Sequence, residues 1–181
     1  MVERLKAEHN VDLEWRPFYL YFDTPPEGRE LPEHVKRARA SGSEERLRQI
    51  AESYGMEFVS TQRIYNTRLA HEATEYARVN GEGNEFHKVV FRKVYAEGQD
   101  PSQWEVLRSA TEEVGLDAAE MQREVENEKY MATVVDKVRW AYQIGITGVP
   151  TYVINNRYAI VGAQPYEVFK GALEQIMGQK D

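Results

Sequence analysis

The run Gly145-Ile146-Thr147-Gly148-Val149-Pro150 constrains the fold of this chain more than any other stretch. A helical pattern stops at Gly145, a short loop follows, and a β-rich run from Thr151 to Ile154 opens directly on the proline. Proline is tolerated there because its missing N–H can lie outside a ladder of strand hydrogen bonds. X-Pro bonds are also the one place where cis peptides cost little. The pattern therefore predicts either a trans proline in an edge strand or a cis proline that turns the chain sharply.

The cis alternative gives Val149 a specific role. Its N–H and C=O would face outward without partners, and they could bind an extended peptide or a thiol ligand as an added strand does. In the trans alternative the same residues form an ordinary edge strand. Residues 145–150 alone leave both alternatives open.

A hairpin and a helix are predicted after the proline. Two β-branched and aromatic runs, 151–154 and 157–161, are separated by Asn155-Asn156. Both asparagines tolerate positive φ, so they favour a tight turn between two strands. A helix then begins with Pro165 near its first position. Its apolar stripe at helical spacing consists of Val168, Phe169, Ala172, Leu173 and Ile176. Loop, proline, hairpin and helix in this order are the C-terminal half of a thioredoxin fold.

The runs Gly148–Ile154 and Tyr158–Pro165 resemble the DsbA-like thioredoxin-fold family. The resemblance covers essentially the whole chain, and its upstream matches are Trp15–Phe18, Pro25–Gly28, Asn66–Thr67 and Phe86–His87 to Tyr95. The branch that looks most similar is that of the FrnE-type proteins, which are related to 2-hydroxychromene-2-carboxylate isomerases and kappa-class glutathione transferases. The resemblance implies an α/β, thioredoxin-like fold with a large all-helical insertion. It places the core at residues 1–30 and 145–181 and the inserted domain at 31–144.

One part of the family pattern is missing. Members of the family begin with a β-strand that leads into Cys-x-x-Cys at the start of the first helix, whereas this sequence has no cysteine. Its opening run, Val2–Asn10, looks like the tail of that first helix. The absent strand is the central one, so two strands of the core would be left with open edges, which invite pairing. We expect a product of a mis-assigned start, direct pairing of the two strands, or a partner chain that fills the gap.

The first of those two strands is predicted at Val11–Leu20, where apolar and polar residues alternate. Helices are predicted almost throughout 31–144. Ser41 and Glu44 have the spacing of a capping box, and the helix that they open is expected to turn Leu47, Ile50, Ala51 and Tyr54 inward. Asn66 is a good N-cap for a later helix, and in isomerase-like relatives an asparagine at this helix start lies near the substrate cleft.

Composition excludes several classes of function. The net charge of −7 argues against nucleic-acid binding, which needs a basic surface. No apolar run is long enough for a membrane span, and no signal-peptide pattern follows Met1, so a cytoplasmic location is expected. The histidines His9, His34, His71 and His87 lack metal-ligand spacing, so neither a metal nor another cofactor is predicted. Without cysteine, thiolate nucleophiles are excluded from these 181 residues.

The resemblance implies a DsbA-family thiol–disulfide oxidoreductase, but we expect this cysteine-free chain to lack dithiol activity and name no catalytic residue. The expected substrate-binding residues are Thr147, Val149, Pro150 and Asn66. The partners that the resemblance implies are a thiol or disulfide protein, or a small thiol such as glutathione, with a homodimer among the expected assemblies. Two alternatives stay open: a non-catalytic binding or assembly module that uses the proline groove, and a glutathione-dependent isomerase.

Overall fold

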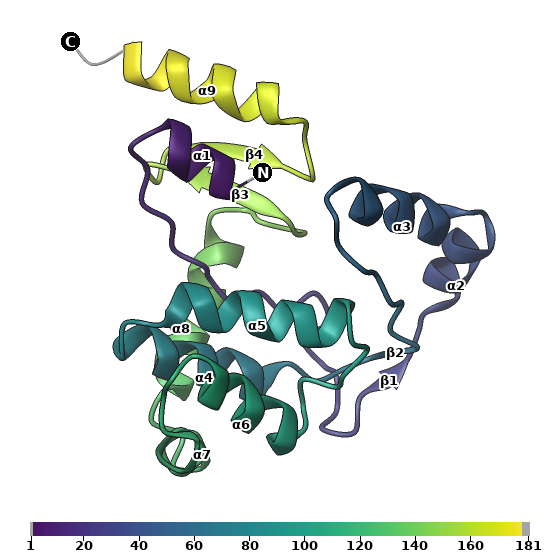
Figure 1. Ribbon diagram of the computed structural model, residues 1–181, viewed down its shortest axis with the longest axis vertical. Coiled ribbons are helices and arrows are strands. Elements are labelled where there is room, and N and C mark those ends of the chain that lie inside the picture. The colour runs from purple at the N-terminus through teal and green to yellow at the C-terminus, as the bar shows by residue number, and fades with distance from the viewer. Residues whose placement is uncertain (1, 179–181) are drawn as a thin grey trace. The chain divides into compact units, whose positions relative to one another are not determined.

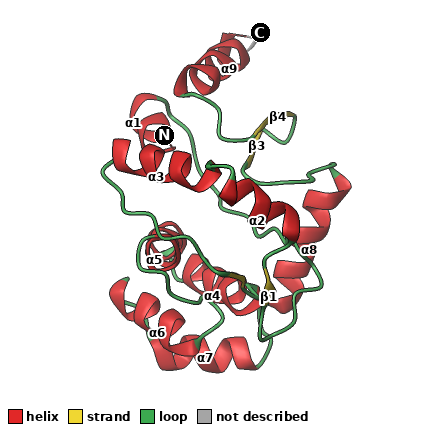
Figure 2. Cartoon of the chain, turned by 90° about the vertical axis from the view of Figure 1, so that its right-hand side faces the viewer, coloured by secondary structure: helices red, strands yellow, loops and turns green. Residues whose placement is uncertain are grey.

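A computed structural model of the chain describes residues 2–178, so Met1, where the question of the true start lies, falls outside it. The chain divides into two compact units, residues 1–20 with 138–181 and residues 21–137. Figure 1 shows the order of the elements along the chain. Figure 2 shows that helices dominate. The strands form two short pairs, β1 with β2 and β3 with β4.

Unit 21–137 is a helical bundle with one small strand pair. Its elements are β1 (Arg29–Glu30), α2 (Glu33–Ala40), α3 (Ser43–Ser53), β2 (Arg63–Ile64), α4 (Arg68–Val79), α5 (Gly83–Tyr95), α6 (Trp104–Glu113), α7 (Ala118–Glu126) and the first part of α8 (Met131–Gln143). Its core lies among α4, α5, α6 and α7, where Ala73, Phe86, Leu107, Met121 and Val125 are fully buried. The prediction of helices between residues 66 and 144 is confirmed.

Local capping explains where α7 begins. The Asp117 side chain accepts hydrogen bonds from the backbone amides of Ala119 at 2.8 Å and Glu120 at 2.9 Å, which satisfies two of the free N–H groups at a helix start. The neighbouring Tyr76 hydroxyl of α4 hydrogen-bonds to the Asp117 carbonyl at 3.2 Å and to Glu120 at 3.0 Å. The cap of one helix therefore also ties that helix to the next.

The predictions for α2 and α3 were partly wrong. Ser41 does not open a capping box, since its hydroxyl donates to the Ala38 carbonyl at 2.8 Å at the end of α2, and Gly42 is the N-cap of α3. Of the residues expected to point inward, only Ala51 is buried. The other three are largely exposed: Leu47 at 51%, Ile50 at 55% and Tyr54 at 65%. Helical periodicity predicts an apolar stripe correctly, but it does not say whether another element covers that stripe.

The other unit contains α1 (Val2–Glu8), the end of α8, β3 (Thr151–Ile154), β4 (Tyr158–Val161) and α9 (Tyr166–Gly178). The hairpin is confirmed. Asn155 and Asn156 have φ of 52° and 53°, and Thr151 lies opposite Val161 in the antiparallel register.

One face of this hairpin is covered by α1 and α9. Leu5 of α1 and Phe169 and Leu173 of α9 are buried, and Tyr152, Ile154 and Ile160 of the hairpin pack against them. The Tyr152 and Phe169 rings meet edge to face at 4.7 Å. Alternate residues of β3 and β4 therefore point into this small core, as the alternation of side chains along a strand requires.

The predicted strand at Val11–Leu20 is absent from the structure, which shows no strand between residues 11 and 20. Val11 packs against the small core instead. Farther along, the Phe18 and Tyr142 rings lie 5.1 Å apart, and the Tyr142 hydroxyl donates to the Tyr19 carbonyl at 2.7 Å. Alternation predicts a strand only where a neighbouring strand supplies the ladder. This segment has aromatic contacts with α8 and no ladder.

Between residues 2 and 178, no helix has both the length and the apolar character needed to cross a bilayer.

Candidate functional site

The predicted substrate loop begins where α8 ends. Gly145 has φ of 83°, and the amide of Ile146 donates to the Ala141 carbonyl at 3.0 Å. This positive φ favours glycine, which lets the chain leave the helix and close its last carbonyls. The loop then runs through Thr147 and Gly148 to the proline, so that three of the four expected binding residues lie in one short segment.

Val149 presents its main chain at the surface of this loop. The Val149–Pro150 peptide bond is cis, and Val149 is 53% exposed. Neither its N–H nor its C=O is hydrogen-bonded to any residue that the structure describes. A side-chain hydrogen bond holds the loop in place, because the Thr151 hydroxyl donates to the Gly148 carbonyl at 2.7 Å.

A single hydrogen bond fixes the orientation of β3. The Gly162 amide donates to the Pro150 carbonyl at 2.8 Å. Opposed residues in an antiparallel pair alternate between bonded and non-bonded, and Tyr152 lies two residues on from Pro150, opposite Ile160. Tyr152 therefore directs its main chain to β4, while Thr151 and Val153 direct theirs to the opposite side. We call the N–H and C=O groups of Thr151 and Val153 the outer edge of β3.

Asn66 belongs to the other unit and makes two structural hydrogen bonds. Its Nδ2 donates to the Thr24 carbonyl at 2.7 Å, and its Oδ1 accepts from the Arg68 amide at 3.0 Å. The helix α4 starts at Arg68, and its N-cap is Thr67. Asn66, which was predicted to be the N-cap, lies one residue before Thr67, and its side chain still accepts from the first amide of the helix. Its side chain is fully occupied in holding the Thr24 loop against this helix start.

A family profile described as the DSBA-like thioredoxin domain matches residues 1–174. This chain belongs to the DsbA-like thioredoxin family. The α/β thioredoxin-like fold class with a helical insertion is thereby confirmed.

Two solved structures resemble this DsbA-like chain. A probable DsbA oxidoreductase from Streptomyces coelicolor is 26% identical with a TM-score of 0.81, over 92% of this chain and 75% of that one. A 2-hydroxychromene-2-carboxylate isomerase is 17% identical with a TM-score of 0.79, over 98% of this chain and 87% of that one. At that identity the second likeness shows the fold alone. A search of curated proteins gave no significant match.

Sequence reasoning missed two buried carboxyl groups on α4 of this DsbA-like chain. Glu72 is fully buried, and Arg68 Nε lies 3.3 Å from its Oε1 without the geometry of a hydrogen bond. Burial raises the pKa of Glu72, the charge of Glu128 adds to this effect, and that of Arg68 opposes it. Glu75 is equally buried but well paired, with Lys137 at 2.6 Å and Arg78 at 2.7 Å. Acidic residues within a helical stripe give no sequence signal of burial.

Two histidines near the start of α4 and α5 are held neutral. Burial lowers the pKa of His71 to about 4, although the charge of Glu75 raises it in part. Burial likewise lowers the pKa of His87 to about 4, with a further contribution from His71. The His71 ring lies 3.2 Å from the Thr67 hydroxyl.

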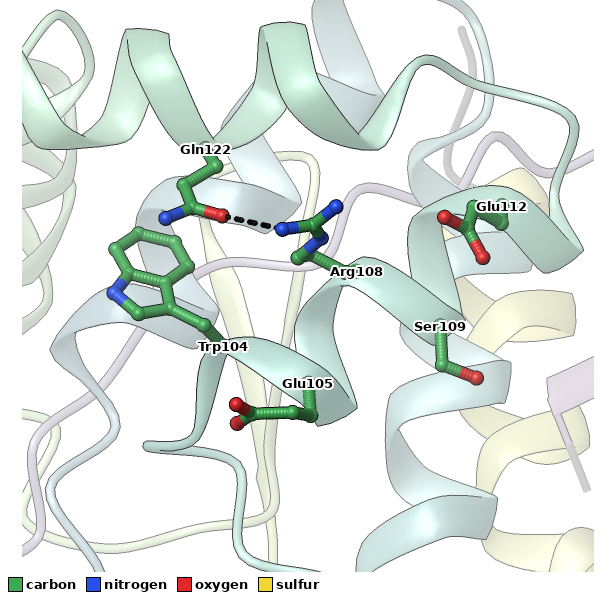
Figure 3. Close-up of a pocket in the computed structure, with 6 residues that line it drawn as sticks. All are labelled: Trp104, Glu105, Arg108, Ser109, Glu112 and Gln122. Atoms are coloured by element: carbon green, nitrogen blue, oxygen red, sulfur yellow. Dashed lines mark hydrogen bonds between the residues drawn. The ribbon is translucent and has the colours of Figure 1, made fainter.

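A surface hollow of about 430 Å³ lies on α6 and α7. Figure 3 shows Trp104 and Arg108 reaching from α6 toward Gln122 of α7, where Arg108 donates to the Gln122 amide oxygen at 3.4 Å. The two acidic residues Glu105 and Glu112 share the rim with Arg108. The charges there are mixed and solvated, so the hollow offers no chemistry comparable to the open main chain at Val149.

Proposed function

We propose that this member of the DsbA-like family is a binding module that holds an extended thiol- or disulfide-bearing polypeptide at its proline loop, and that these residues carry out no thiol–disulfide exchange themselves. The observation that carries the proposal is the main chain of Val149. This main chain is exposed, it is unpaired within the described residues, and it is separated from β3 by Pro150 alone. An extended peptide binds such a segment through main-chain hydrogen bonds, as an added strand does.

The same loop contains Thr147 and Pro150, the other expected binding residues of this unit. Thr147 is exposed, and its hydroxyl is not engaged by any residue that the structure describes, so it is available to a ligand. Pro150 directs its carbonyl to Gly162 and has no N–H, so it offers the ligand no competing donor. Asn66 is proposed only as a residue that shapes the Thr24 loop, because both polar ends of its side chain are used there.

Thiol–disulfide exchange requires a thiolate that attacks a disulfide sulfur. The 181 residues contain no cysteine, so they supply no such nucleophile. The family match and the Streptomyces relative favour oxidoreductase chemistry for the lineage, and the FrnE-type branch with a cytoplasmic location is our proposal for its place in that lineage. A glutathione-dependent isomerase is the remaining alternative, and it too needs a reactive group that we do not find here.

Binding is tested with a fluorescein-labelled, blocked octapeptide of alternating valine and threonine with one central S-methylated cysteine, read by fluorescence anisotropy. Val149→Pro removes the N–H of Val149 at a position where the following proline already favours extended backbone. Val149→Ala keeps that N–H and is the matched control. We expect the proline variant to bind roughly tenfold more weakly, the scale of one main-chain hydrogen bond, and the alanine variant to bind like wild type.

Equal affinity of the two Val149 variants would contradict the binding proposal, as would the absence of any binding by wild type. Free glutathione as competitor separates a small-thiol site from a peptide site, because only a shared site lets glutathione displace the peptide. An insulin-reduction assay tests the second half of the proposal. Turnover above buffer by the 181-residue chain would contradict it.

A further inference from the structure

Asparagine followed directly by glycine occurs once in the 181 residues, at Asn80-Gly81, where α4 joins α5. In such a pair the main-chain nitrogen of the glycine can attack the side-chain amide carbon of the asparagine, since glycine has no Cβ to crowd the approach. Both residues are exposed to solvent, so the water that completes the reaction can reach them. The pair lies in unit 21–137, apart from the proposed peptide site in the other unit.

The fold places this pair in a closed helix end. Asn80 is the C-cap of α4, with φ of −91° and ψ of 10°, and Gly81 follows it with φ of 90°. The Glu82 amide donates to the Ala77 carbonyl at 2.8 Å, and the Gly81 amide donates to the Arg78 carbonyl at 3.2 Å. These two bonds form the Schellman motif that ends many helices. The attacking nitrogen of Gly81 is therefore already engaged in a hydrogen bond.

The amide carbon of Asn80 is held away from that nitrogen as well. Asn80 Nδ2 donates to the Tyr76 carbonyl at 2.9 Å, which ties the side chain back along α4. A five-membered ring needs the Asn80 Cβ and the Gly81 nitrogen on the same side of the Cα–C bond, so ψ of Asn80 must turn far from 10°. That rotation breaks the bonds of the Schellman motif. Ring closure therefore requires the end of α4 to open first.

We propose that Asn80 is a latent site of self-modification, which the closed turn protects and which reacts when the end of α4 opens. The Gly81 N–H gives up its proton to solvent, its nitrogen forms a bond to Cγ of Asn80, and ammonia leaves to give a succinimide. One water molecule then opens the ring at either carbonyl. The product is an aspartate at position 80, or an isoaspartate whose main chain runs through the former side chain.

The end of α7 has the same backbone without the reactive pair. Asn127 is the C-cap there, with φ of −81° and ψ of 9°, and Glu128 follows it with φ of 55°. The Glu128 amide donates to the Val125 carbonyl at 2.9 Å, and the Lys129 amide donates to the Glu124 carbonyl at 3.1 Å, as in a Schellman motif. The Cβ of Glu128 hinders attack on Asn127. This helix end is therefore an internal control with similar protection and lower reactivity.

The modified turn cannot close as before. The next helix, α5, begins at Gly83, where a Cβ would lie 2.9 Å from Cα of Arg78, so the two helix ends meet without spare room. An isoaspartate adds one main-chain atom at this contact. An aspartate keeps the chain length, but it replaces the donor to the Tyr76 carbonyl with a negative charge at the C-terminus of α4, where the helix dipole disfavours it. Each reaction therefore marks the joint between α4 and α5 permanently.

Peptide mapping by mass spectrometry of the intact chain after incubation at physiological pH tests the proposal. We expect conversion at Asn80 to be at least about tenfold slower in buffer than in denaturing guanidinium chloride, because the folded turn limits the reactive population. Sub-denaturing guanidinium should raise the rate in step with hydrogen exchange of the Glu82 amide, which reports opening of the same turn. Equal rates in buffer and denaturant would overturn the proposal, as would conversion in denaturant that is no faster at Asn80 than at Asn127.

Two glycine substitutions test the control by the turn. Gly83→Ala places a Cβ against Cα of Arg78 and loosens the joint, so conversion at Asn80 in buffer should rise at least about threefold. Gly171 lies in α9 of the other unit, where a Cβ would meet nothing within 4 Å, and Gly171→Ala is the matched control with an unchanged rate. Equal rates in the two variants would contradict the proposal. If circular dichroism shows that Gly83→Ala unfolds, the denaturant series on the wild-type chain decides.

Discussion

The Gly162 amide donates to the Pro150 carbonyl at 2.8 Å, and this bond determines which way each residue of β3 faces. The alternation that follows turns Tyr152 toward β4 and leaves Thr151 and Val153 pointing outward. It also makes Pro150 the last inward-facing residue, so that Val149 begins the open part of the loop. The proposed peptide site follows from this hydrogen bond.

The core beneath the hairpin depends on one aromatic side chain. Phe169 is 2% exposed and meets the Tyr152 ring edge to face at 4.7 Å. We expect Phe169→Ala to lower the free energy of unfolding of its unit by about 3–5 kcal/mol. The neighbouring Val168 is 45% exposed, and Val168→Ala is expected to change that free energy by less than about 0.5 kcal/mol.

Urea unfolding monitored by tryptophan fluorescence checks this difference. Trp15 and Trp140 lie in the unit of Phe169, and Trp104 lies in the other, so a Trp104→Phe background makes the signal specific to the unit under test. Similar losses for the two alanine variants would show that α9 does not pack as described.

Asn66 is expected to act on stability through its two hydrogen bonds. Asn66→Ala removes the donor to the Thr24 carbonyl and the acceptor for the Arg68 amide. The expected loss in free energy of unfolding is about 1–2 kcal/mol. Asn66→Asp keeps the acceptor at the helix start and should recover part of that loss. If chemical denaturation shows no change for the alanine variant, the structural role assigned to Asn66 is wrong.

The buried carboxyl of Glu72 predicts a pH-dependent effect. Burial raises its pKa, so the folded state favours the protonated form and loses stability as the pH rises through the folded pKa. Glu72→Gln should therefore stabilise the fold at pH 7, by roughly 1 kcal/mol, the scale of a buried unsatisfied group. The gain should shrink as the pH falls below the folded pKa of Glu72.

Glu75→Gln is the matched control on the same helix. Glu75 is paired with Lys137 and Arg78, and Glu75→Gln breaks both of these ion pairs on a buried side chain. We expect a loss of about 3 kcal/mol at pH 7. Denaturation midpoints at several pH values measure both variants, and a destabilised Glu72→Gln at pH 7 would mean that its carboxylate is better paired than the geometry indicates.

The exposed stripe of α3 predicts tolerance to polar substitution. Leu47 is 51% exposed, so Leu47→Ser should change the free energy of unfolding by no more than about 0.5 kcal/mol. Leu107 is fully buried in the bundle, and Leu107→Ala should lower it by about 2–5 kcal/mol. A large loss for Leu47→Ser in the denaturation midpoint would show that a further element covers α3 in solution.

Sequence information sufficed where the structure is determined locally. The Asn155-Asn156 turn and the strands on both sides of it depend on residues a few positions apart, and both were predicted. The strand predicted at Val11–Leu20 is absent, because a strand exists only where a neighbour completes its ladder. The inward stripe of α3 failed for the same kind of reason, since Leu47 and Ile50 needed a covering partner.

The candidate site shows the same division. The position of the candidate site in the chain was predictable, because glycine and proline residues surround Thr147 and Val149 in the sequence. Which main-chain groups stay open depends on the Gly162–Pro150 hydrogen bond, and no pattern of residue types indicates that bond. The burial of Glu72 and Glu75 was also unpredictable, because acidic residues on a helix usually face solvent.

Residue-resolved amide hydrogen exchange tests the open edge of β3 most directly. The amides of Thr151 and Val153 should exchange at least about tenfold faster than those of Tyr152 and Ile160, since only the latter are bonded within the hairpin. Protection of the Thr151 and Val153 amides equal to that of the Tyr152 amide would contradict the account, because the outer edge of β3 would then be covered.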